Sequence, residues 1–208
     1  MHGPESAGRE VPEEETAELE RGRRIHAGDE AALDALLQRD HPVVDLLARV
    51  LASDAGPGDS AARAWERLVT GLAAARFPEL GLRAAVLDHL VDVLDEDGLL
   101  DTASRETVWS GTFLGEGDPW AGWWEEEPPV WPPDLTLAPD QVLAALRAVP
   151  PGPRLLLVLR DVAALREDQA EMVSGYTEKE QEILLESARE SYVVALDMLV
   201  KEGAHACG

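Results

Sequence analysis

Apolar residues recur at steps of three and four between residues 25 and 97, which is the spacing of one buried face of an α-helix. Asp29 and Asp59 stand where they can cap helices, and His41-Pro42 interrupts the first apolar run. That run therefore predicts either two helices or one kinked helix. Together with the runs ARAWERLVTGL and ELGLRAAVLDHLVDVL, it predicts an N-terminal bundle of about three or four helices.

A second helical pattern covers residues 139–202. It opens in PDQVLAALRAV, breaks at PPGP and continues with the strongly apolar run RLLLVLRDVAAL. A short helix over 166–173, a turn at Gly175 and a long helix from Thr177 follow. Thr177 and Glu180 form a capping-box pattern at the start of the long helix. A short helix, a glycine turn and a capped long helix are the outline of a helix-turn-helix.

The remaining segments have no helical period. Residues 1–24 are Glu-rich and polar, and we expect a disordered acidic arm whose last part can join the first helix. Residues 98–138 hold five of the six tryptophans among Gly and Pro, and they predict a linker. Residues 203–208 form a tail. The expected fold is all-α, with two small helical domains at 25–97 and 139–202 joined by the Trp/Pro-rich linker.

Composition narrows the choice of partners. The chain has 208 residues, of which 45% are apolar, enough for buried cores, but its formal net charge is −23. This charge repels nucleic acid and favours proteins or basic surfaces as partners, unless it serves only solubility. The single cysteine, Cys207, allows no intramolecular disulfide and fits a reducing cytosol. Without a signal-peptide pattern or an apolar run of about 18 residues, we expect a cytoplasmic protein with no membrane contact.

Several strings, taken in order, resemble the extracytoplasmic-function (ECF) sigma factors of the sigma-70 class, over nearly everything from Gly28 to Val200. They are AGDEAALDALLQRDHPVVDLLARVL, ARAWERLVTGL, GLRAAVLDHLVDVL, the connector PWAGWWEEEPPVWPP and LRAVPPGPRLLLVLRDVAAL. The resemblance implies that residues 25–97 correspond to sigma region 2, which binds polymerase and reads the promoter −10 element. It also implies that residues 139–202 correspond to sigma region 4, whose helix-turn-helix grips the −35 element.

The surfaces that face DNA in that family are acidic in this chain. The family has basic or amide side chains there, whereas carboxylates repel phosphates, so we expect promoter binding to be weak or absent. Arg63 in SAARAW likewise replaces the acidic and amide residues with which the family contacts polymerase. These charges can also be ordinary solvated helix faces. The acidic faces are Glu178, Glu182, Glu186 and Glu190 on the recognition-like helix, and Asp88, Asp92 and Asp95 on the −10-like helix.

We therefore expect a sigma-factor-like transcription regulator that contacts RNA polymerase, a sigma factor or an anti-sigma factor. It can mimic the charge of DNA or act as a decoy for an anti-sigma protein. The alternatives are a working sigma factor and a ligand-binding protein or enzyme on the same scaffold. We expect no enzyme activity, cofactor or metal, because the sequence has no pattern for a nucleophile–base pair, a phosphate loop or a cysteine-rich site. The candidate partner-binding aromatic residues are Trp65, Trp120, Trp123, Trp124 and Trp131.

Overall fold

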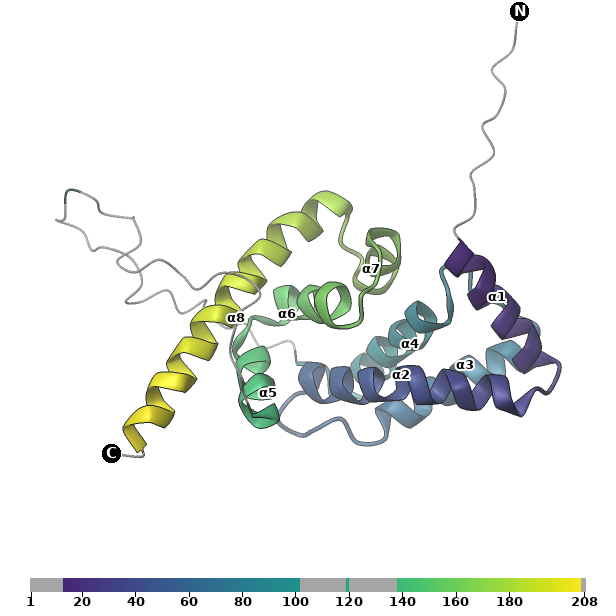
Figure 1. Cartoon of the computed structure of the whole chain (residues 1–208), viewed down its shortest axis with the longest axis horizontal. Coiled ribbons are helices and arrows are strands. Elements are labelled where there is room, and N and C mark those ends of the chain that lie inside the picture. The colour runs from purple at the N-terminus through teal and green to yellow at the C-terminus, as the bar shows by residue number, and fades with distance from the viewer. Residues whose placement is uncertain (1–12, 102–118, 120–137, 207–208) are drawn as a thin grey trace, which may run out of the picture.

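Helices form most of the chain in a computed structural model that describes residues 13–101, 119 and 138–206 (Figure 1). The predicted all-α fold is confirmed for these residues, in which a single β-bridge joins Ala52 and Leu100. None of the helices in these ranges is long and apolar enough to cross a bilayer. The elements are α1 (Glu13–His26), α2 (Glu30–Leu51), α3 (Ser60–Ala73), α4 (Leu82–Glu96), α5 (Pro139–Ala148), α6 (Pro151–Leu157), the π-helical turn η1 (Val158–Val162), α7 (Glu167–Ser174) and α8 (Glu178–Ala206).

Helix α1 corrects the predicted disordered arm at 1–24, because residues 13–24 belong to a helix that packs on α2, α3 and α4. Glu18 holds this helix in place. Its carboxylate accepts a hydrogen bond from the Leu82 backbone N–H at 2.7 Å and pairs with Arg39 at 2.7 Å. Both partners are distant in the sequence, so local composition could not distinguish this segment from a disordered arm.

Helix α2 runs without a break through Pro42, so the first apolar run is one helix and not two. It begins as predicted at Asp29, whose carboxylate accepts a hydrogen bond from the Ala32 backbone N–H at 3.0 Å. Asp40 of α2 is fully buried and pairs with Arg83 of α4 at 2.7 Å. A buried charge is tolerated when it is paired in this way, and the pair links α2 to α4.

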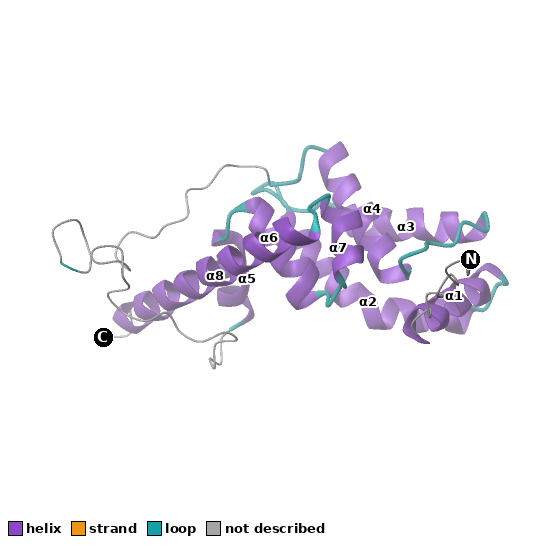
Figure 2. Ribbon diagram, turned by 90° about the horizontal axis from the view of Figure 1, so that it is seen from above, coloured by secondary structure: helices purple, strands orange, loops and turns teal. Residues whose placement is uncertain are grey.

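The two halves of the chain that were predicted as domains pack against each other and share one hydrophobic core (Figure 2). Helix α4 contacts α7, and α2 contacts α5 and α6. Leu36 and Leu87 of the first half belong to the same buried cluster as Leu157 and Leu196 of the second. The division into two separate domains stays a prediction, but the packing between the halves is continuous.

A buried arginine joins the two halves. Arg154 of α6 is 1% exposed, and its Nη1 donates to Asp101 Oδ2 at 3.0 Å. The same guanidinium donates to the carbonyl oxygens of Val50 at 3.1 Å and Val149 at 2.9 Å. Asp101 falls within the predicted linker at 98–138, so the first residues of that segment are part of the folded core. Most of the rest of the segment lies outside the described residues.

Candidate functional site

The helix-turn-helix outline predicted from residue 166 onward is present as α7, a turn and α8. Gly175 ends α7 with a left-handed backbone (φ 73°), which glycine adopts without strain. At the start of α8, the Thr177 backbone N–H donates to Glu180 Oε2 at 2.9 Å, and the Thr177 hydroxyl donates to the same oxygen at 2.7 Å. These hydrogen bonds lower the pKa of Glu180. The predicted pairing is confirmed, and it fixes where α8 begins.

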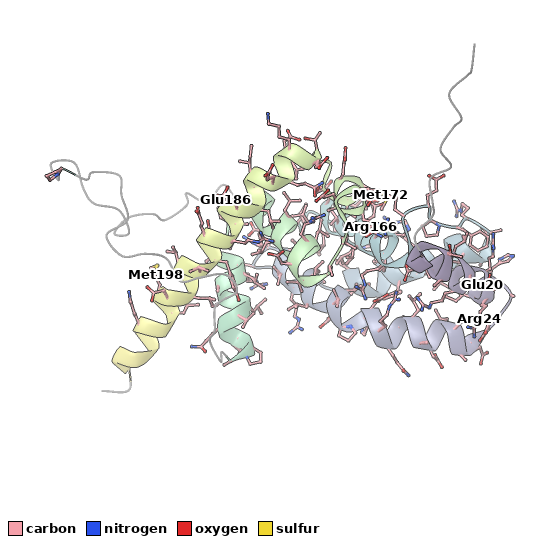
Figure 3. All side chains as sticks on the ribbon, turned by 45° about the horizontal axis from the view of Figure 1, so that its top comes forward. Glu20, Arg24, Arg166, Met172, Glu186 and Met198 are labelled. Carbon is pink, nitrogen blue, oxygen red and sulfur yellow. The ribbon has the colours of Figure 1, made fainter. Side chains whose placement is uncertain are left out.

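One face of α8 forms a groove with η1 and α7, which we call the α7–α8 groove. The four glutamates predicted as the acidic recognition-like face all line it, so the structure brings them together. Glu178, Glu182 and Glu186 are exposed, and Glu186 is labelled on α8 in Figure 3. Burial raises the pKa of the half-buried Glu190, and the charge of Glu186 raises it further. The lining residues are Arg160, Glu167, Glu178, Gln181, Glu182, Leu185, Glu186, Arg189 and Glu190.

The two arginines of the α7–α8 groove pair with carboxylates. Arg189 of α8 donates from Nε and Nη2 to the two oxygens of Asp161, at 2.8 and 2.7 Å. Arg160 donates from Nη2 to Glu167 Oε1 at 3.1 Å. The glutamates of α8 therefore leave the groove with an excess of negative charge, which attracts cations and basic proteins.

Two polar atoms of the groove, Gln181 Oε1 and Arg160 Nη1, are buried and have no hydrogen-bond partner. Gln181 is 2% exposed, and its Nε2 donates to the carbonyl oxygens of Glu167 at 3.1 Å and Tyr176 at 2.9 Å. Because both of those partners are acceptors, only the NH₂ group can face them, and Oε1 must point away. Buried atoms without a partner are uncommon in folded proteins.

The π-helical turn η1, which positions Arg160 and Asp161 beside α8, was not predicted from the sequence. Its wider winding is seen in the hydrogen bond from the Ala163 backbone N–H to the Val158 carbonyl oxygen at 2.8 Å. Ala164 then adopts a positive φ of 54°, which is uncommon for a residue with a side chain. The apolar run RLLLVLRDVAAL has a period that an α-helix satisfies equally well, so no local signal revealed this turn.

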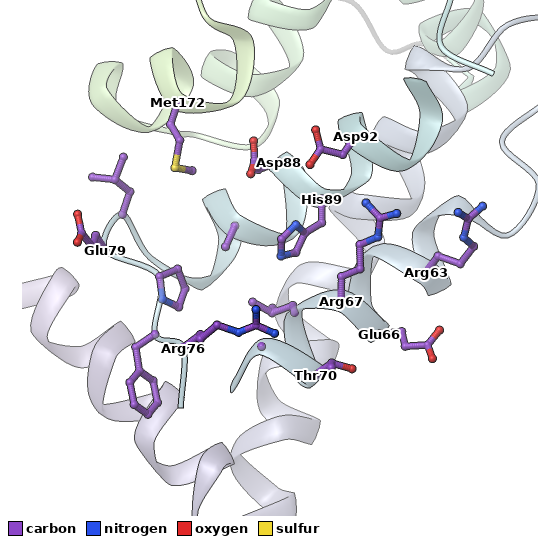
Figure 4. Close-up of a pocket in the computed structure, with 16 residues that line it drawn as sticks. Arg63, Glu66, Arg67, Thr70, Arg76, Glu79, Asp88, His89, Asp92 and Met172 are labelled. Atoms are coloured by element: carbon purple, nitrogen blue, oxygen red, sulfur yellow. The ribbon is translucent and has the colours of Figure 1, made fainter. Parts of the chain in front are cut away.

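The other predicted acidic face lies on α4, beside a groove of about 990 Å³ between α3, α4 and α7 (Figure 4). Asp88 and Asp92 line this groove, while Asp95 is exposed and outside its lining. Burial raises the pKa of Asp88, and the charge of Asp92 raises it further. Asp88, His89 and Asp92 present three possible metal-ligating atoms within 4.8 Å of one another.

Arginines of α3 pair with two acidic residues at the end of α4, beyond the predicted acidic face. Arg67 pairs with Glu96, with Nη1 donating to Oε1 at 3.2 Å, and Arg63 pairs with Asp97. The Glu96 carboxylate raises the pKa of Arg67, and Asp92 adds to the effect. The ion pairs between α3 and α4 therefore involve Glu96 and Asp97.

Trp65, predicted as a partner-binding aromatic residue, is 6% exposed and belongs to the hydrophobic core. That prediction is wrong, because Trp65 lies on the apolar stripe of α3 with Leu68 and Leu72, which faces inward. The other predicted aromatic residues lie outside the described part of the chain: Trp120, Trp123, Trp124 and Trp131.

Comparison of the chain with protein-family models, with curated proteins and with solved structures gives no match in any of the three. Over the described residues, the fold and the surface define a class of protein: an all-α chain with an acidic groove along the second helix of a helix-turn-helix outline. Such a surface attracts basic groups and repels phosphate.

Proposed function

We propose that this chain is a sigma-factor-like regulator that acts through protein–protein contacts, with RNA polymerase, a sigma factor or an anti-sigma factor as its partner. One observation carries the proposal: Glu178, Glu182, Glu186 and Glu190 line a single groove on the helix that resembles a recognition helix. A helix that binds DNA needs cations on this face to neutralise phosphates. The acidic groove instead complements a basic protein surface.

The packing of the two halves supports the same proposal. A helix that reads the −10 element needs an open face, whereas α7 packs against α4. Two hydrogen bonds hold the neighbouring turns in place. Arg83 of α4 donates from Nη1 to the carbonyl oxygen of Ala163, after η1, at 3.1 Å, and Gln169 of α7 donates from Nε2 to the carbonyl oxygen of Leu80, before α4, at 2.5 Å. Region 2-like and region 4-like segments held together in this way have little freedom to span two promoter elements.

Mimicry of DNA charge is the mechanism that the surface favours. In this mechanism the glutamates of α8 occupy a basic surface that would otherwise hold DNA, and long-range attraction speeds the encounter. A decoy that captures an anti-sigma protein between the two halves would first have to separate them. Their shared core and the buried Arg154–Asp101 pair oppose that separation. We therefore propose the mimic and not the decoy.

The direct test is binding and transcription with purified components from the organism that encodes the chain. Core RNA polymerase, its sigma factors and their anti-sigma proteins are each titrated against the chain at low and physiological salt. The variant E182Q/E186Q/E190Q removes three charges of the groove and should weaken binding to the true partner by more than about tenfold. A matched control, D34N/D54N/E66Q, removes three exposed charges elsewhere and should leave binding nearly unchanged. Promoter-specific initiation by polymerase loaded with this chain would overturn the proposal.

A further inference from the structure

The α7–α8 groove has hydrogen-bonding capacity that the chain itself does not use. Gln181 Oε1 accepts from no donor, and Arg160 Nη1 donates to no acceptor, although both residues line the same groove. The Gln181 amide cannot turn over to relieve this, because its Nε2 is held by two carbonyl oxygens. The other terminal nitrogen of Arg160, Nη2, donates to Glu167 Oε1. A ligand that satisfies both atoms must bring one donor and one acceptor.

We infer that the α7–α8 groove is a receptor for an arginine-containing peptide segment of the partner protein. The arginine side chain enters among the glutamates of α8 and donates to Gln181 Oε1, and a main-chain carbonyl oxygen of the segment accepts from Arg160 Nη1. This inference rests on the proposed function, since it gives the chemistry by which the acidic groove recognises its partner.

A peptide fits the groove better than other ligands of the same charge. A metal cation provides no acceptor for Arg160 and is repelled by it, and nucleic acid phosphates are repelled by the glutamates. Arginine is favoured over lysine because a guanidinium presents five donors in a plane. Carboxylates four residues apart on a helix and a buried amide oxygen can share these donors, whereas an ammonium group is a compact point charge.

We assign the segment to another molecule. Outside its described residues the chain has two arginines, Arg9 and Arg105, and each is followed directly by a glutamate that the acidic groove repels. Solvent does not reach Gln181 Oε1 or Arg160 Nη1, so the bound segment meets them after side chains bordering the groove rotate. Glu182 and Glu186 are exposed, long and unbranched, and such side chains change rotamer easily.

The test uses the full chain and short capped peptides that are otherwise Gly, Ser and Ala: one with two arginines, one with two lysines and one with two citrullines. Binding is measured by calorimetry at low salt. We expect the arginine peptide to bind roughly tenfold more tightly than the lysine peptide, and the citrulline peptide not to bind. Equal affinities for arginine and lysine peptides, or no arginine-peptide binding at all, would overturn the inference.

Variants that keep the charge test the two unpartnered atoms. Arg160→Lys keeps the positive charge but loses the forked donor, and it should weaken the arginine peptide by roughly fivefold to tenfold. Gln181→Met keeps the size and removes the acceptor together with the Nε2 hydrogen bonds to Glu167 and Tyr176, with a similar expected loss of affinity. Circular dichroism reports whether it still folds. Arg76→Lys, at an exposed site outside the groove, is the control and should have no effect. No change with Arg160→Lys would mean that the groove attracts cations by charge alone.

These outcomes separate the inference from the proposed function. If E182Q/E186Q/E190Q abolishes binding to a transcription protein while Arg160→Lys has no effect on the peptide, the proposed function stands and the inference fails. If the arginine peptide binds as expected but no polymerase, sigma or anti-sigma protein does, the groove is a peptide receptor and the proposed function fails. Tighter binding of duplex DNA than of the arginine peptide would reject both.

Discussion

Helices α4 and α8 both carry carboxylates at steps of four residues, but the structure surrounds the two acidic faces differently. On α4, arginines of the neighbouring α3 pair with acidic residues near its end, among them Glu96 with Arg67, and α7 packs on the same helix. On α8, Glu182 and Glu186 are exposed in a groove, and Gln181 Oε1 beside them accepts from no donor. The ion pairs of α4 thus lie at its end, at Glu96 and Asp97, whereas the groove of α8 contains a buried amide oxygen that no donor satisfies.

This difference shows that acidic spacing along a helix does not by itself define a function. The neighbouring element decides the outcome. Helix α3 supplies arginines one turn apart, at Arg63 and Arg67, that reach the end of α4. The π-turn η1 supplies Arg160 and Asp161, but these pair mainly with Glu167 and Arg189, and the four glutamates of α8 remain in excess.

The largest expected effect comes from the buried joint that ties α6 to Asp101 and to Val50 of α2. Arg154→Met removes the guanidinium that pairs with Asp101 and leaves that carboxylate buried without its arginine. Breaking a buried pair in this way should lower the free energy of unfolding by about 3–5 kcal/mol. It should also loosen the contact between α6 and α2, on which the comparison of two faces held in one folded body depends. Urea denaturation measures the loss of stability, and hydrogen exchange measures the protection of α2 and α6.

The control for this prediction is Arg147→Met. Arg147 donates to the Arg49 carbonyl oxygen at 2.8 Å, in a contact that also crosses between the halves but is open to solvent. Its removal should cost less than about 1 kcal/mol. Similar losses for Arg154→Met and Arg147→Met would contradict the importance given to the buried joint.

The next effect tests whether α8 keeps the geometry of a recognition helix. Glu182→Arg with Glu186→Arg raises the net charge by four, because each substitution changes it by two. The variant should bind duplex DNA, and the logarithm of its binding constant should fall with the logarithm of the salt concentration with a slope of roughly −2. An affinity gain of about tenfold to a hundredfold corresponds to about 1.4–2.7 kcal/mol. The matched variant Asp92→Arg with Asp95→Arg makes the same change of charge at two exposed sites of α4, which is not the second helix of a helix-turn-helix outline. It should gain much less affinity, and equal gains would show that bulk charge alone matters. Fluorescence anisotropy with a labelled duplex measures both variants.

Local patterns predicted much of this fold. The helix starts at Asp29 and Thr177 follow from side chains that bond to nearby backbone groups, which the sequence displays directly. The shared face of the α8 glutamates follows from their spacing of four residues, whatever the tertiary structure. These features depend on neighbours within one or two helical turns, so they could be seen without the structure.

Features that depend on distant partners were missed. Helix α1 is held by Glu18 at the start of α4, and Arg154 meets Asp101 from 53 residues away. The burial of Trp65 could not be distinguished from exposure, because an apolar stripe on a helix can face a core or a partner. Gln181 Oε1 has no partner because the Gln181 Nε2 is held by the carbonyl oxygen of Tyr176, in the turn before α8, and by that of Glu167 in α7.

A smaller effect concerns the ion pairs of α4. Arg67→Ala removes the pair with Glu96. Because both side chains are exposed to solvent, the loss of stability should be small and should shrink in high salt. Arg76→Ala, an exposed arginine of the same region, should change the stability by less than about 0.5 kcal/mol. Urea denaturation at low and high salt measures both. A loss for Arg67→Ala that does not depend on salt would mean that packing, and not charge, holds α3 to α4.

The smallest effect compares one carboxyl from each face, Asp88 on α4 and Glu190 on α8. Burial is the main cause that raises the pKa of each above its ordinary value, 3.8 for Asp88 and 4.5 for Glu190. A raised folded-state pKa means that the ionised form destabilises the fold, so stability falls as the pH rises from the ordinary value through the raised one. Asp88→Asn and Glu190→Gln should therefore each stabilise the protein at pH 8, by less than about 0.5 kcal/mol because both groups are partly solvated. The gain should shrink as the pH falls toward about 4, near the ordinary pKa of these groups. Urea titrations at the two pH values measure these changes, and Asp95→Asn, at an exposed site, is the control. If Asp88→Asn were less stable than the unchanged protein at pH 8, burial could not be the cause of the raised pKa.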